Sequence, residues 1–67
     1  MSIMKSIQVM AESTKSFEDA IDMAVRRTSK TVKDVRSANV NNQSCVVENG
    51  EVKKYRVNVQ ITFAVGD

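Results

Sequence analysis

The sequence predicts an α+β fold in the order β-α-β-β: a three-stranded antiparallel sheet with one amphipathic helix packed on one face. Residues 52–65 alternate between apolar and polar side chains, the period of a strand with one buried face. Residues 16–33 repeat apolar side chains every three or four positions, as an amphipathic helix does. Asn49-Gly50 lies between two extended segments and favours a two-residue hairpin turn, in which both residues take positive φ.

The first strand is expected from Met4 to Met10, and residues 11–15 are expected to form a polar connection. The helix then begins at Ser16, whose hydroxyl can accept a hydrogen bond from the first turn, with Asp19 in the third position of a capping box. Acidic side chains come early in this segment and basic ones late, which complements the helix dipole. The apolar stripe consists of Phe17, Ala20, Ile21, Ala24, Val25 and Thr28, and it reaches Val32 if the helix continues.

The second strand is expected from about Arg36 to Val47, paired with residues 52–65 so that partner numbers sum to 99. This register separates apolar from polar side chains, and a slip by one residue would mix them. Asn42 is the exception because it falls opposite Val57, so we expect a bulge near Asn42. The predicted pairs are Ala38–Ile61, Val40–Val59 and Ser44–Tyr55 on the apolar face, and Ser37–Thr62, Asn39–Gln60, Asn41–Asn58, Gln43–Arg56 and Cys45–Lys54 on the polar face.

The third strand is long for so short a chain. Its residues 52–65 reach roughly 46 Å, whereas a compact globule of 67 residues is roughly 28 Å across. We expect one domain, residues 1–67, and domains of this size usually need an additional stabilising element. Cys45 is the only cysteine and histidine is absent, which excludes an intrachain disulfide and argues against structural zinc. Homo-oligomerisation is therefore the stabilising element that we expect. The single thiol fits a reducing cytoplasm.

The composition argues against several classes of function. The net charge of +2 gives no strong bias toward nucleic acid or a membrane surface, and neither is expected as a partner. No apolar run approaches the roughly 20 residues of a transmembrane helix. No nucleophile–base pair, metal-ligand set or phosphate-binding loop can be assembled from these residues, so the protein is not expected to be an enzyme.

Several segments together resemble the dodecins, a family of small β-α-β-β proteins. They are residues 16–21 and 27–32, the hairpin around Asn49-Gly50, and the stretch from Val59 to Phe63, and the resemblance extends over nearly the whole chain. It implies a hollow homododecamer of cubic symmetry that binds flavins such as riboflavin or FMN in pairs between subunits. It also implies a role in buffering or storing flavin, without catalysis.

The positions that would hold the flavin depart from the family pattern. Flavin-binding dodecins carry a Trp near the start of the second strand, which stacks on the isoalloxazine ring, and a Gln on the third strand, which hydrogen-bonds the ring edge. By alignment through the helix end and the hairpin turn, these positions fall on Ser37 and Arg56. The chain has no Trp, and its three aromatic residues belong to the helix stripe and the apolar sheet face: Phe17, Tyr55 and Phe63. Flavin binding is therefore expected to be weak or absent.

We expect a dodecin-like homododecamer that binds or stores a small ligand in an inter-subunit pocket lined by Ser37, Arg56 and Gln43. Riboflavin or FMN is the cofactor that the resemblance implies. The alternative is a ligand-free or ion-binding hollow shell with a structural or interaction role. Amides and hydroxyls of the polar face can supply oxygen ligands to a hard cation, or the face is simply a solvated or subunit-facing surface. Its members are Ser37, Asn39, Asn41, Gln43, Arg56, Asn58, Gln60 and Thr62.

Overall fold

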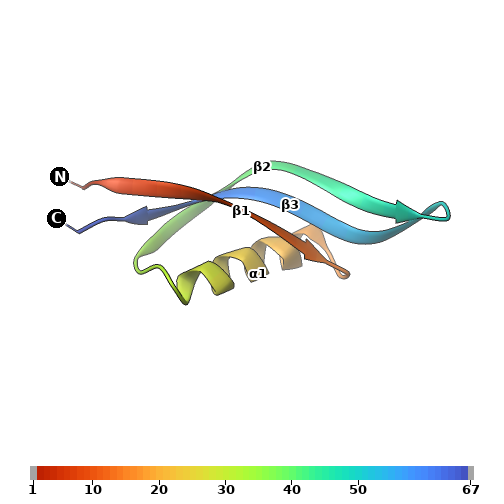
Figure 1. Cartoon of the computed structure of the whole chain (residues 1–67), viewed down its shortest axis with the longest axis horizontal. Coiled ribbons are helices and arrows are strands. Elements are labelled where there is room, and N and C mark those ends of the chain that lie inside the picture. The colour runs from red at the N-terminus through yellow and green to blue at the C-terminus, as the bar shows by residue number, and fades with distance from the viewer. Residues whose placement is uncertain (1, 67) are drawn as a thin grey trace.

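A computed structural model describes residues 2–66 and has the predicted element order (Figure 1). The elements are β1 (Met4–Ser13), α1 (Phe17–Ser29), β2 (Val35–Glu48) and β3 (Glu51–Ala64). The strands form one antiparallel sheet in the order β1-β3-β2, which confirms that the first strand lies beside the third. Among the described residues, α1 is the one helix, and it is too short and too polar to cross a membrane.

The start of α1 is fixed by three side chains before and within its first turn. Ser16 is the N-cap, and its hydroxyl accepts a hydrogen bond from the Asp19 amide at 2.9 Å, as predicted. The Asp19 carboxylate instead accepts from the Ser13 hydroxyl at 2.6 Å, and the same Ser13 oxygen accepts from the Lys15 amide. The last residue of β1 therefore completes the cap and couples the strand to the helix.

β1 is three residues longer than the sequence pattern predicts. Ala11, Glu12 and Ser13, expected in a polar connection, continue the ladder opposite Val57, Arg56 and Tyr55. Glu12 and Ser13 are polar, as loop residues often are, but Ala11 packs on the core and Ser13 is buried beneath the helix cap. α1 in turn ends at Ser29, so Val32 lies beyond it.

The core lies between α1 and the middle of β3. It is formed by small helix residues against branched strand residues, with Phe17 and Tyr55 closing one end in an edge-to-face contact of 5.1 Å between ring centroids. The alternate residues of β3 point to the opposite side of the sheet, which we call the open face because α1 does not cover it. The buried core residues are Ala20, Ala24, Val57, Val59 and Ile61.

The predicted register between β2 and β3 holds from Ser37 to Val40 and again beside the turn, but it fails at the start of β2, where Val35 pairs with Phe63, and between two further irregularities. The pairs from Ser37–Thr62 to Val40–Val59 are confirmed, as are the turn, with φ of 52° at Asn49 and 77° at Gly50, and the Glu48–Glu51 pair. A bulge between Val40 and Asn42, expected from the sequence, shifts the next five pairs by one residue. A second irregularity between Val46 and Val47, where Lys53 is passed over on β3, restores the original register.

This shift corrects the predicted pairings of residues 42–46. Asn42 pairs with Asn58 and not with Val57, and Cys45 pairs with Tyr55 and not with Lys54. Ser44 pairs with Arg56 on the open face, so it exchanges faces with Gln43, which pairs with Val57. The single bulged residue turns the side chains that follow it to the opposite side of the strand.

The chain is elongated, as the length of the third strand indicates. Its principal extents are 51 × 19 × 13 Å and its radius of gyration is 13.7 Å, against roughly 11 Å for a compact domain of this length. β1 ends opposite Tyr55, so residues 46–54 continue as two strands only. This segment, which we call the hairpin arm, projects beyond both α1 and β1 (Figure 1).

Candidate functional site: the open face of the sheet

The open face carries cross-strand rows whose chemistry changes along the sheet. At one end Ser6, Thr62 and Ser37 form a row of hydroxyls, followed by an amide row of Gln8, Gln60 and Asn39. The next row is Met10, Asn58 and Asn42, and the last row is Glu12, Arg56 and Ser44. The face therefore runs from neutral hydroxyls at one end to a charged cluster at the other.

The amide side chains bond to one another across all three strands. Gln8 Nε2 donates to Asn58 Oδ1 at 2.8 Å, and Gln60 Nε2 donates to Ser6 Oγ at 2.8 Å. The bulged residue Asn41 extends this network, because its Nδ2 donates to Gln60 Oε1 at 3.4 Å and its Oδ1 accepts from Asn39 at 3.1 Å. These groups are exposed or half-buried and offer a polar ligand both donors and acceptors.

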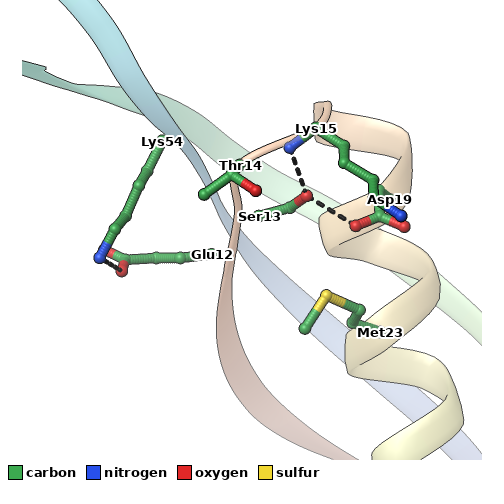
Figure 2. Close-up of a pocket in the computed structure, with 7 residues that line it drawn as sticks. All are labelled: Glu12, Ser13, Thr14, Lys15, Asp19, Met23 and Lys54. Atoms are coloured by element: carbon green, nitrogen blue, oxygen red, sulfur yellow. Dashed lines mark hydrogen bonds and ion pairs between the residues drawn. The ribbon is translucent and has the colours of Figure 1, made fainter.

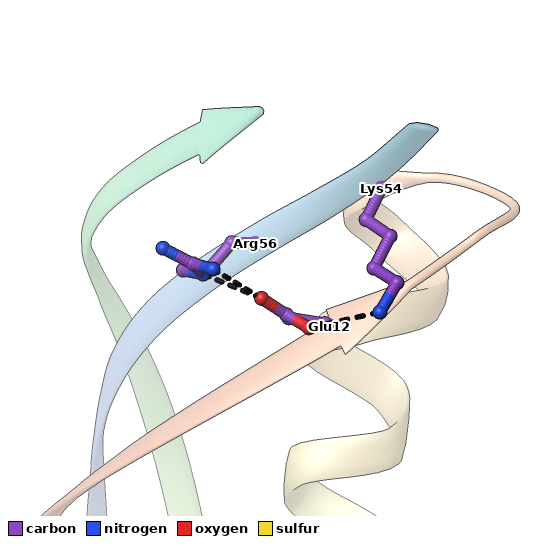
Figure 3. Close-up of polar contacts among 3 residues, drawn as sticks. All are labelled: Glu12, Lys54 and Arg56. Carbon is purple, nitrogen blue, oxygen red and sulfur yellow. Dashed lines mark hydrogen bonds and ion pairs between the residues drawn. The ribbon is translucent and has the colours of Figure 1, made fainter. Parts of the chain in front are cut away.

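The charged end is organised around Glu12. Arg56 donates from Nε to Glu12 Oε2 at 2.7 Å and from Nη2 to the same oxygen, while Lys54 Nζ lies 3.7 Å from Glu12 Oε1 (Figure 3). The hydrogen bond from Arg56 lowers the pKa of the Glu12 carboxyl from its ordinary value. Desolvation opposes this shift, and the positive charges of Arg56 and Lys54 reinforce it.

A shallow hollow of about 580 Å³ lies where β1 passes into α1 (Figure 2). It is open to solvent, and Figure 2 shows Glu12 and Lys54 meeting on one side while Met23 projects from the helix on the other. Ser13 and Asp19 on its wall bond to each other and serve the helix cap. The hollow is lined by Glu12, Ser13, Thr14, Lys15, Asp19, Met23 and Lys54.

The three site residues predicted from the sequence do not meet within one chain. Ser37 and Arg56 both lie on the open face, but Ser37 pairs with Thr62, six positions along β3 from Arg56, or about 20 Å at the usual rise of a strand. Gln43 lies on the other side of the sheet, paired with Val57. A pocket that used both Ser37 and Arg56 would need residues of a second subunit to bridge them.

Glu12 is the charged residue of this site that the sequence reasoning missed. It was placed in a connection, although the alternation of Ile7, Val9 and Ala11 continues in register and places Glu12 beside Arg56. Following that period of two for two further residues would have found it. Ser6 and Gln8 were also missed, since the polar face was read only from the hairpin strands.

The open face of the described residues carries no aromatic ring. Phe17 and Tyr55 contact each other on the helix side, and Phe63 pairs with Lys5 and Val35 there. Within residues 2–66, no group of three or more His, Cys, Asp or Glu side chains is placed to hold a metal ion. Over the described residues, the face therefore offers hydrogen bonds and one charged cluster, but neither an aromatic stacking platform nor a cluster of three carboxylate, thiol or imidazole ligands.

Comparison with known proteins gives a consistent result. The dodecin family model matches residues 3–66. Calcium dodecin from Mycobacterium tuberculosis is 33% identical over 63 residues, 94% of this chain and 89% of that protein. A crystal structure of that calcium dodecin, described as calcium chelating with a novel calcium-binding site, aligns with a TM-score of 0.83 and 32% identity over 97% of this chain and 93% of that one. A mutant dodecin from Thermus thermophilus aligns with a TM-score of 0.92 over 100% of both chains at 22% identity, which supports the fold.

Proposed function

Since the chain belongs to the dodecin family, we propose that it is a homododecameric binding or storage protein that holds a small polar ligand between subunits without stacking a flavin. The observation that carries this proposal is the chemistry of the open face, where rows of hydroxyls and amides cross all three strands and no ring is present. Ser37, at the stacking position implied by the family resemblance, presents only a hydroxyl. A polar ligand matches these donors and acceptors, whereas an isoalloxazine ring finds no platform.

The shape of the subunit supports assembly. The hairpin arm is a two-stranded ribbon whose Val47 and Val52 are 58% and 50% exposed. Isolated two-stranded ribbons are marginally stable in water, so a neighbouring subunit that covers this arm would stabilise it. The distance between Ser37 and Arg56 supports the same arrangement, because a ligand site between them is completed only by another copy.

Calcium is the second candidate ligand, favoured by the similarity to a protein named calcium dodecin. Calcium takes six to eight oxygen ligands, which side-chain amides, hydroxyls and carboxylates all supply. Since the described residues of one chain hold no cluster of three acidic or thiol ligands, the ligands would come from several subunits around a symmetry axis. The proposal includes a binding role in place of catalysis, and a cytoplasmic location that suits the exposed free thiol of Cys45.

Light scattering on a size-exclusion column, with absorbance recorded near 450 nm with and without riboflavin, tests assembly and flavin binding together. We expect a particle of about twelve subunits that takes up no flavin. Ser37→Trp should restore part of the flavin uptake and Ser37→Ala should restore none, because only the former adds a ring to the open face. A monomer would contradict the assembly, and a wild-type particle that turns yellow would contradict the assignment of Ser37.

Titration calorimetry with calcium chloride on chelator-treated protein tests the second candidate. Calcium binding should saturate at a fixed fraction of an ion per subunit, since a site on a symmetry axis is shared. Magnesium is the matched control, because its preference for a small octahedral shell makes a flexible oxygen site favour calcium. Heat signals equal for both ions, or none for calcium, would remove calcium as a ligand.

A further inference from the structure

Arg56 does not present a free guanidinium to the open face. Its Nε and Nη2 hydrogens both point to Glu12 Oε2 across the β1–β3 pairing (Figure 3). This is one of the two edges of the guanidinium that can bind a carboxylate or a phosphate in a forked geometry. A carboxylate of the same chain thus occupies one binding edge of Arg56 and opposes its charge, which weakens the attraction for an incoming anion.

The other charges nearby do not replace Arg56 as an anion site. Lys54 lies 3.7 Å from the second oxygen of Glu12, so the same carboxylate faces both cations. Lys15 and Asp19 lie on the wall of the adjoining hollow, where Asp19 accepts from Ser13. The neighbour of Arg56 on β2 is Ser44, which is neutral. Glu12 is therefore the acidic group in contact with both Arg56 and Lys54.

We infer that Glu12 determines the charge of the ligand that the open face accepts at Arg56: its carboxylate occupies one edge of the guanidinium and opposes the charges of Arg56 and Lys54, so the site favours neutral polar ligands over phosphate-bearing anions. This inference rests on the proposed ligand site and adds to it a residue that determines specificity. Removing the carboxylate leaves Arg56 and Lys54 as two adjacent cations, which is the composition of a phosphate site.

Pyrophosphate binding, measured by titration calorimetry at low ionic strength on the assembled protein, tests the inference. Glu12→Gln should bind pyrophosphate about tenfold or more tightly than the wild type, since a charge-assisted hydrogen-bonding edge becomes free. Glu51→Gln is the matched control, because it removes a carboxylate that pairs with Lys53 at 2.8 Å and changes the net charge equally without releasing Arg56. The double variant Glu12→Gln/Arg56→Gln should lose the gain. Glu12→Ser is a second variant for the case in which Glu12→Gln fails to assemble.

Equal affinity of the wild type and both Glu12 variants would overturn the inference, and so would an equal gain in Glu51→Gln, which would indicate a general effect of net charge. A gain that survives the double variant would assign the anion to Lys54 and also overturn it. These outcomes are independent of the proposed function, because the variants can gain pyrophosphate binding even if the wild-type protein holds no organic ligand. Conversely, the wild type can bind a neutral ligand, as the proposed function expects, while the Glu12 variants gain no affinity for pyrophosphate, which would overturn only the inference on Glu12.

Discussion

The part of the sheet under α1 and the hairpin arm share β2 and β3, but only the former also contains β1, and the two regions are stabilised differently. Under the helix, β3 buries Val57, Val59 and Ile61 completely, whereas in the arm Val47 and Val52 are at least half exposed. The register that the sequence pattern predicts holds at Val59 and Ile61, is shifted by one residue from Val57 toward the arm, and returns at Val52 beside the turn. A buried stripe fixes strand register, because a slip would place apolar side chains in water.

The part under α1, which we call the covered part, and the hairpin arm also differ in what they contribute: one folds the subunit and the other is proposed to join it to further subunits. The covered part contains the contacts that fold one subunit: the core, the helix cap and the aromatic pair. In the proposed function, the arm and the open face are the surfaces that contact other subunits and the ligand. Substitutions in the two regions should therefore affect different measurements, the stability of the chain in one case and its assembly in the other.

The largest effect is expected from Ile61→Ala in the covered part. Removing this fully buried side chain should lower the free energy of unfolding by about 2–5 kcal/mol, from lost burial and the cavity left behind. Denaturant unfolding at a dilution that favours separate subunits measures it. Val52→Ala in the arm is the control and should stay within about 0.5 kcal/mol. Equal losses for both variants would break the distinction between the two regions.

The next effect is expected at the tip of the arm. Gly50 has a φ of 77° and an added Cβ would meet nothing within 4 Å, so Gly50→Ala introduces backbone strain alone. The cost should be about 1–2 kcal/mol, seen as a lower midpoint of thermal unfolding. Gly66→Ala, also at positive φ but beyond β3, should change the midpoint much less. A neutral Gly50→Ala would mean that the turn relaxes in solution.

A smaller effect is expected at the helix start. Ser16→Ala removes the hydroxyl that accepts from the Asp19 amide and should destabilise the fold by about 1 kcal/mol. Ser29→Ala at the exposed far end of α1 is the matched control and should be near neutral. Circular dichroism during denaturation follows both variants. If the two behaved alike, the Ser13–Asp19 bond alone would suffice to fix the first turn.

The smallest effect is expected at Glu12 and depends on pH. Its pKa in the folded chain is lowered from 4.5, chiefly by the hydrogen bond from Arg56. A lowered pKa means that the paired carboxylate stabilises the fold above pH 4.5, and that this contribution is lost as the pH falls through the lowered value. Stability measured from neutral pH down to about pH 3 should fall less steeply for Glu12→Gln than for the wild type. Glu51→Gln should keep the wild-type slope.

Much of the fold could be predicted because its signals are local. The cap at Ser16, the turn at Asn49-Gly50 and the apolar stripe of α1 each depend on a few neighbouring residues. The pairs near Val59 and Ile61 were also correct, because one face there is buried and the other is wet. The candidate site was predicted less well: Ser37 and Arg56 lie on the expected face, while Gln43 does not.

The sequence alone determined the element order, the helix limits near Ser16, the hairpin turn and the family, because these depend on short-range patterns. Only the tertiary structure decided that the expected bulge lies at Asn41, that it is compensated at Lys53, and that Glu12 pairs with Arg56. Residues 41–45 of β2 are exposed on both faces, so no buried apolar period on this strand fixes the register there. Glu12 and Arg56 are 44 residues apart, and their meeting depends on how far the β1 ladder extends, a property of the folded sheet that no local segment contains.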